Sequence, residues 1–213
     1  MDYKVEDIID VVERQMEALY QDENYRDRSF EHCYTFFQSY RKDSTKRIDI
    51  TLHLFSFLAS WGMLRNSFLM GKDYLLLSPV VDILCDDKYD DLIHMDLSLN
   101  NSQYWTDKIL LIRDEISSCY GDSIHMTETL ISKILLGTFG CVPAYDDYLK
   151  SGLKMKGMCQ TLNRCSLSQI FQFASQNIED INCEILNIEQ ARKIKYPVMK
   201  IIDSYFWQIG KQN

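Results

Sequence analysis

The sequence predicts an all-α protein, a compact bundle of about 8–10 helices, and three observations support this fold class. The 213 residues include only 8 Gly and 3 Pro, well below the roughly 12% of average proteins, and β-hairpins depend on these residues for their turns. Apolar residues recur at steps of three and four along most of the chain, the period of an amphipathic helix. With 46% hydrophobic and 25% charged residues, the chain also falls outside the disordered and fibrous classes.

Four helices are expected in the first hundred residues. An apolar stripe from Val5 to Tyr20 leaves Glu13 and Glu17 facing water. The third expected helix, residues 48–64, is apolar on most sides, which predicts burial in the middle of the protein. Proline is tolerated in a first helical turn, so Pro79 can open the fourth helix, and the acidic run DDKYDD after it is expected to be a solvated break. The expected helices cover residues 5–20, a segment from about residue 29, residues 48–64 and residues 79–87.

The rest of the chain carries the usual start and stop signals of helices. Expected helices cover residues 104–118, a segment from about residue 126, a segment that begins near residue 143, residues 167–177 and residues 197–210. The signals are Gly121 as a stop, Gly137 and Gly140 as interruptions, Pro143 as a start, Ser166 with Gln169 as a capping box, and Pro197 and Gly210 at the two ends of the last helix.

A single domain over residues 1–213 is expected, and two lobes, 1–100 and 101–213, that share one core are the alternative. The seven Cys are odd in number and form no C-x-x-C pair, which favours reduced thiols in a cytoplasmic protein over a zinc site or a disulfide framework. The N-terminus is acidic and lacks the apolar core of a secretory signal. The apolar stretch 50–64 is shorter than the roughly 20 residues that span a bilayer, so no membrane partner is expected.

The formal net charge is −8, which excludes uniform binding to phosphates, but the charge is unevenly distributed. Residues 1–149 carry 14 basic and 26 acidic side chains, whereas residues 150–213 carry 9 basic and 5 acidic ones. One basic run has no acid within it, and it predicts either a solvated face or a local site for nucleic acid or a nucleotide. An acidic face that meets a protein partner or a second copy of the chain is the other interpretation. The basic run consists of Lys150, Lys154, Lys156 and Arg164.

Common catalytic and cofactor motifs are absent from the sequence. It has no G-x-x-x-x-G-K-[ST], G-x-G-x-x-G or G-x-S-x-G motif, and its four His residues form no H-x-x-x-H pair. No cofactor and no metal site are therefore expected. His53, on the apolar third helix, is interpreted as a core residue.

The best candidate for chemistry is Asp146, at the head of a helix. A carboxylate at such a place is stabilised by free N–H groups and by the helix dipole, so a purely structural role remains open. Held rigidly, the same carboxylate can position water or stabilise a developing cation. Catalysis and simple binding therefore both remain open.

The run SKILLGTFGCVPAYDDYLKSGL resembles the strip that carries the catalytic Asp in the helix-hairpin-helix DNA glycosylase superfamily. Residues 125–211 also resemble uncharacterised bacterial helical proteins with an SK-x-L…P-x-x-D pattern and a late D-x-x-x-W-Q-x-G-K. That late motif is matched here by Asp203, Trp207, Gln208, Gly210 and Lys211. The L-P-G-[VI]-G loop with which the glycosylase superfamily binds a phosphate is missing from this sequence. Lys133 does not occupy the position of the hairpin lysine of that superfamily.

The resemblance implies a helix-hairpin-helix arrangement in the C-terminal half and a glycosylase-like protein that acts on or binds nucleic acid or nucleotides. Asp146 would stabilise the oxocarbenium-like sugar or align water after the base is flipped out. Trp207 could stack on a base or be part of the core. The cleft around Asp146 would be lined by Lys133, Tyr145, Lys150, Lys154 and Trp207. The alternative is a non-catalytic interaction protein or a homo-oligomer.

Overall fold

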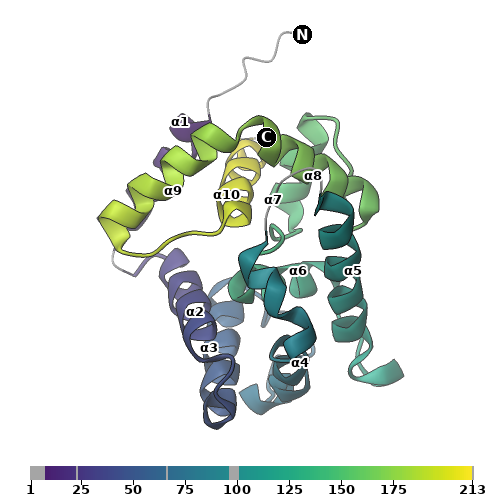
Figure 1. The fold of residues 1–213 in the computed structure, drawn as a ribbon. Helices are drawn as coiled ribbons and strands as arrows, with labels where there is room; N and C mark the ends of the chain where they lie inside the picture. Colours follow the sequence, from purple (N-terminus) through teal and green to yellow (C-terminus); the bar gives the residue numbers. More distant parts are fainter. Residues whose placement is uncertain (1–7, 23, 66, 96–100, 213) are drawn as a thin grey trace.

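The computed structural model describes residues 8–22, 24–65, 67–95 and 101–212 (Figure 1). These residues form ten α-helices and several short 3-10 helices, and no strand occurs among them. The prediction of an all-α bundle is confirmed. Val5, at the start of the first expected stripe, lies outside the described residues.

The helices in the first part of the chain are α1 (Ile8–Gln21), α2 (Asp27–Tyr40), η1 (Ser44–Lys46), α3 (Arg47–Ser60), η2 (Tyr74–Leu77), α4 (Ser78–Leu84) and η3 (Asp87–His94). The later helices are α5 (Ser102–Ser118), η5 (Gly121–Ser123), α6 (Glu128–Thr138), α7 (Asp147–Met155), α8 (Arg164–Gln176), α9 (Ile178–Arg192) and α10 (Val198–Lys211).

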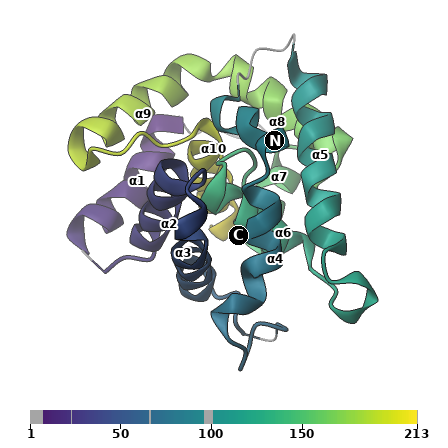
Figure 2. The ribbon, with the colours of Figure 1, turned by 60° about the horizontal axis from the view of Figure 1, so that its bottom comes forward.

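Helix α10 is the central element of the bundle. Both ribbon views place it in the middle, with α1 and α9 on one side and α5 and α8 on the other (Figures 1 and 2). It packs against α7, α1 and α9, and nearly all of its residues are buried because its apolar side chains cover most of its circumference. Buried apolar side chains from Ile8 to Ile209 form one continuous cluster around it.

The closest approach between helices joins α7 and α10 and depends on two glycines. A Cβ atom on Gly152 would lie under 3.0 Å from the carbonyl oxygen of Phe206. A Cβ on Gly210 would lie under 3.0 Å from the carbonyl oxygen of Tyr148. Gly210 was expected to end the last helix, but α10 continues to Lys211, and the glycine instead allows the two backbones to touch.

The acidic run DDKYDD is solvated in part, as expected, because Asp86, Asp87 and Lys88 are exposed. It does not break the fold, however, since most of it belongs to the 3-10 helix η3, which buries Tyr89. The expectation that α3 is buried on most sides is wrong, because only five of its 14 residues are buried and Ile48 is 60% exposed. None of the described helices combines the length and the apolar composition needed to cross a bilayer.

Two helix starts differ from the expected ones. Pro143 lies in the connection after α6, and α7 begins only at Asp147. Helix α8 begins at Arg164, and its N-cap is Asn163, whose side chain accepts the N–H of Ser166. The expected capping box therefore does not form.

Helix α9 was not expected from the sequence. It follows α8 directly after Asn177, with neither proline nor glycine between the two helices. Apolar residues at helical spacing, Ile181, Ile185 and Ile188, form its buried side. The expected helix 167–177 ends where α8 ends, but no helix is predicted for residues 178–196, where no proline or glycine marks a helix start or stop.

The expectation that the cysteines are reduced is wrong for two of them. Cys159 and Cys165 form a disulfide in the connection from α7 to α8. The two residues are separated by only six positions, a spacing that matches none of the metal or redox patterns usually sought in sequences. Cys33, Cys85 and Cys141 are buried free thiols, as expected.

The close contact of α7 and α10 predicts that Gly152→Ala and Gly210→Ala are each destabilising. Alanine normally stabilises a helix interior by up to about 1 kcal/mol relative to glycine, but here the new Cβ meets backbone, which cannot rotate away. We expect a net loss of about 1–3 kcal/mol in the free energy of unfolding, measured with urea. Ser151→Ala, on the same helix, is the control and should change stability by less than about 0.5 kcal/mol. Alanine variants at both glycines that match the wild type in stability would contradict the contact.

Candidate functional site

Six charged side chains gather around the indole ring of Trp61. Three cationic groups approach its centroid, at 4.9, 5.3 and 5.8 Å, distances typical of cation–π contacts. Three carboxylates balance them, so the group is formally neutral. We call this set the charged cluster; it consists of Arg26, Asp27, Lys133, Asp146, Lys200 and Asp203.

The charged cluster forms where helix ends from distant parts of the chain converge. Asp27 lies in the first turn of α2 and Asp146 is the N-cap of α7, so both carboxylates lie at the positive ends of helix dipoles. Trp61 is the C-cap of α3, and its carbonyl oxygen accepts a hydrogen bond of 3.0 Å from Nζ of Lys133. Helix termini thus stabilise acids and a cation that would otherwise be costly to bury.

Asp146 has a fixed orientation and is partly reached by solvent. Its Oδ1 accepts the N–H of Leu149 at 3.0 Å, and its Oδ2 lies 3.9 Å from Nζ of Lys133. Its side chain is 18% exposed, compared with 4% for Asp203. Among the carboxylates of the charged cluster, Asp146 is therefore the one placed to meet a molecule from outside.

Lys133 lies behind Asp146 in the middle of α6, with 8% of its side chain exposed. Burial lowers the pKa of this lysine, and the nearby Asp146 and Asp203 oppose that change only in part. A lysine with a lowered pKa gives up its proton more readily than one at the surface.

Asp203 and Lys200 form the deepest part of the cluster. Nζ of Lys200 lies 3.4 Å from Oδ2 of Asp203 and 3.7 Å from Oδ1 of Asp27. The other oxygen of Asp203 accepts the N–H of Ala144 at 2.9 Å. Burial raises the pKa of Asp203 to about 6, and the charge on Asp146 adds to this effect.

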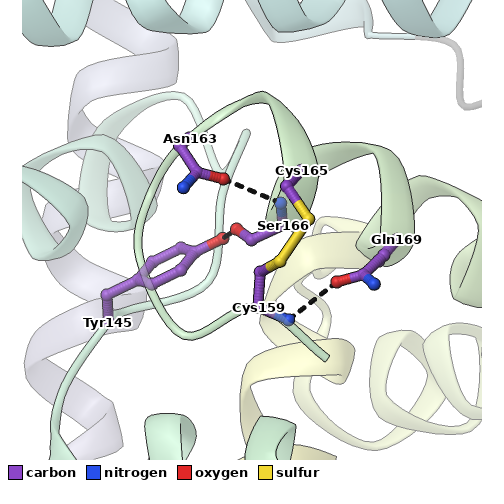
Figure 3. Close-up of a disulfide and its surroundings, with 6 residues drawn as sticks. All are labelled: Tyr145, Cys159, Asn163, Cys165, Ser166 and Gln169. Atoms are coloured by element: carbon purple, nitrogen blue, oxygen red, sulfur yellow. Dashed lines mark hydrogen bonds between the residues drawn. A yellow bond between two sulfur atoms is a disulfide. The ribbon is translucent and has the colours of Figure 1, made fainter. Parts of the chain in front are cut away.

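The side chain of Tyr145 is buried in the core, and its hydroxyl points toward Ser166 (Figure 3). Its hydroxyl shares a hydrogen bond with the Oγ of Ser166, and its backbone N–H donates to the Oγ of Ser132 at 2.8 Å. The side chain is fully buried, and burial raises the pKa of the phenol. Tyr145 thus anchors the residue before Asp146, and its ring does not lie beside the carboxylate.

The basic run after Asp146 is divided among separate partners. Lys150 lies 3.5 Å from Glu128 of α6, and Arg164 pairs with Asp107 of α5. Lys154 is exposed in the last turn of α7. The structure therefore does not bring these cations together beside Asp146 as one phosphate-binding face.

Trp207 contacts the charged cluster through Arg26. The guanidinium carbon of Arg26 lies 4.5 Å from the Trp207 ring centroid and 5.3 Å from that of Trp61, so it bridges the two indoles. Nζ of Lys211 lies 4.8 Å from the Trp207 centroid, and the ring of Tyr148 meets Trp207 edge-on. Trp207 is 7% exposed, whereas Tyr148 is 46% exposed.

Of the residues expected around Asp146, Lys133 forms an ion pair with it. Trp207 instead contacts Arg26, another member of the charged cluster. Sequence reasoning missed four members of the arrangement, because each partner comes from a distant segment. A signal was present for one of them, since Lys200 lies three residues before Asp203 and therefore on the same side of the last helix. The missed residues are Arg26, Asp27, Trp61 and Lys200.

The pairing of Asp146 with Lys133 predicts energetic coupling between the two. Asp146→Asn keeps an oxygen for the N–H of Leu149 but removes the carboxylate facing a buried ammonium, so we expect a loss of about 1–3 kcal/mol. Lys133→Met should cost less in the Asp146→Asn background than in the wild type, by about 0.5–3 kcal/mol. Urea unfolding of the four proteins measures this difference, and strictly additive losses would show that the pair does not interact.

The raised pKa of Asp203 predicts a pH dependence of stability. The folded state binds the proton with a pKa of about 6 and the unfolded state with an ordinary pKa of 3.8, so the acid favours folding at low pH. This contribution, about 3 kcal/mol, is lost as the pH rises from about 4 to about 6. Asp203→Asn lacks the titration, so the stability of the wild type relative to this variant should fall over that range. Urea unfolding at both pH values tests this, and a constant or rising difference would refute it.

Comparisons with protein-family models, with curated proteins and with solved structures found no match for this chain. The likeness of its residues 132–153 to the glycosylase strip remains a prediction from the sequence. The charged cluster and its surroundings are therefore the features of this molecule that bear on function.

Proposed function

We propose that this protein acts on the glycosidic bond of a nucleotide or of nucleic acid, with Asp146 as the functional carboxylate. The observation that carries the proposal is the pairing of a solvent-reached, rigidly held carboxylate with a buried lysine whose pKa is lowered. Buried charged groups with perturbed pKa values are costly to stability, and they occur preferentially at functional sites.

The two groups suit the two charges that develop when a glycosidic bond breaks. Asp146 would stabilise positive charge at the sugar carbon or align the attacking water. Lys133, 3.9 Å away, would donate a proton toward the leaving base. The hydrogen bonds from Leu149 N–H to Asp146 and from Lys133 to the carbonyl of Trp61 support both roles, because they fix each group before substrate arrives.

Aromatic and basic groups near Asp146 support a nucleotide-like substrate. Tyr148 lies two residues after Asp146 and is exposed, so its ring is available to stack on a base. Lys211 is exposed beside Trp207 and is placed to contact a phosphate.

The proposal predicts that Asp146→Asn lowers the release of free base by at least about 100-fold. The assay separates free base from substrate by liquid chromatography, for a panel of nucleosides, mononucleotides, and single- and double-stranded oligonucleotides that include damaged bases. Asp147→Asn is the matched control, because it removes an exposed acid at the next position and should leave the rate within about threefold.

Two outcomes would reject the proposal. One is the absence of base release by the wild-type protein over the whole panel. The other is an Asp146→Asn variant that is folded, as judged by its thermal unfolding, and keeps the wild-type rate. Either result would favour a structural charged cluster in a non-catalytic interaction protein, because Asp146→Asn would then change stability alone.

A further inference from the structure

A pocket of about 700 Å³ lies apart from Asp146, between α2, the end of η3 and the connection from α9 to α10. The chain leaving α9 runs back toward α10 past the end of α2 (Figure 1). Residues of this connection line the pocket. No member of the charged cluster lines it. Its volume is typical of a site for a small molecule.

The wall of this pocket is basic. Lys193, Lys195 and His94 line it, and no Asp or Glu does so within the part of the chain that the structure describes. The whole chain carries 31 acidic and 23 basic side chains, so a wall that has lysines and no acid among its described residues differs from the overall composition. Such a wall attracts anions.

The carboxylate of Glu31, which lies behind this wall, is neutralised by its partners. Both carboxylate oxygens of Glu31 accept hydrogen bonds from the guanidinium of Arg192. Oε1 also accepts the hydroxyl of Tyr196 at 2.9 Å. Glu31 is 2% exposed, so its charge is balanced inside the protein and does not cancel that of the pocket lysines.

The remaining lining combines polar and apolar side chains, which suits a ligand that carries a ring with polar groups. The hydroxyl of Tyr34 makes no hydrogen bond within the described residues, and burial raises the pKa of this phenol to about 12, so it remains a donor. Asn182 contributes a further amide. Ile93, Ile194 and Val198 are partly exposed and supply an apolar surface.

The backbone at Lys193 is strained. Lys193 has φ of +60° and ends α9, and among the described residues other than glycine it alone has a positive φ. Glycine or asparagine is usual at such a position because a side chain with a Cβ strains the left-handed conformation. Its Nζ donates to the carbonyl of Gln190 at 3.0 Å, which holds the ammonium at the end of α9. Strain of this kind is typically retained at functional sites.

We propose that this pocket binds a small phosphate-bearing ligand of mononucleotide size. The phosphate lies against Lys193, Lys195 and His94. The ring lies against the surface formed by Tyr34, Ile194 and Val198. The site is separate from Asp146 and does not depend on the activity proposed there.

Calorimetric titration of the full-length protein with adenosine 5′-monophosphate, adenosine and inorganic phosphate tests the proposal. The monophosphate should bind at least tenfold more tightly than adenosine, because adenosine lacks the charge that the wall recognises. Lys193→Gly and Lys195→Gln should each weaken binding of the monophosphate by about tenfold. Lys193→Gly also relieves the strain at φ +60°, so its unfolding temperature should not fall and lost binding cannot be ascribed to misfolding.

Two controls distinguish binding in this pocket from binding elsewhere on the protein. Lys72→Gln removes one exposed positive charge outside the pocket and should leave binding of the monophosphate unchanged. Asp146→Asn should also bind it like the wild type, which distinguishes failure of this proposal from failure of the proposed activity. The proposal is overturned if neither the monophosphate nor phosphate binds, if adenosine binds equally well, or if both pocket variants retain wild-type affinity.

Discussion

The ammonium of Lys200 imposes the constraint on which the rest of the structure depends. It is 1% exposed, and a buried cation requires carboxylates close by. Asp203, one turn further along α10, supplies one, and Asp27, in the first turn of α2, supplies the other. The pairing therefore fixes the start of α2 against the central helix. Asp203 then uses its second oxygen to hold the N–H of Ala144, two residues before Asp146. The buried ammonium of Lys200 thus helps to determine where the carboxylate of Asp146 lies near the surface.

Helix α10 also relates the two candidate sites. Met199 lines the pocket, and the next residue, Lys200, belongs to the charged cluster. Helix α2 has the same double role, with Asp27 in the cluster and Tyr34 in the pocket wall. The two sites therefore lie along the same pair of rigid helices and face different stretches of surface. A protein with a central helix can support both in this way because each turn of the helix meets different neighbours.

The sequence was informative where a signal is local. Periodicity predicted α1, α5 and α10, and the position of Asp146 at the head of a helix follows from the residue types around it. Helix α9 was missed because neither a proline at its start nor a glycine at its end marks it. Tyr145 was assigned to the site because it neighbours Asp146, but consecutive residues in an extended segment point in different directions.

The partners of Lys200 and the lining of the pocket were beyond sequence reasoning for another reason. Asp27 lies near one end of the chain and Lys200 near the other, and no spacing rule connects them. The pocket wall is assembled from α2, η3, the loop after α6 and the approach to α10. Only the folded arrangement of the bundle places these segments together. The uneven charge of the sequence showed that the last part of the chain is basic, but not where its lysines would meet.

The Cys159–Cys165 disulfide has a consequence for the environments in which this fold can exist. The bond closes a very short ring, so it restricts the unfolded chain only modestly, by about 2 kcal/mol. The same segment is tied down without it. Gln169 accepts the N–H of Cys159, and Leu162 is held on both sides, by Arg113 at its carbonyl and by Glu128 at its N–H. We therefore expect the turn to keep its shape whether the two sulfurs are joined or carry hydrogens, and the bundle to tolerate both oxidising and reducing surroundings.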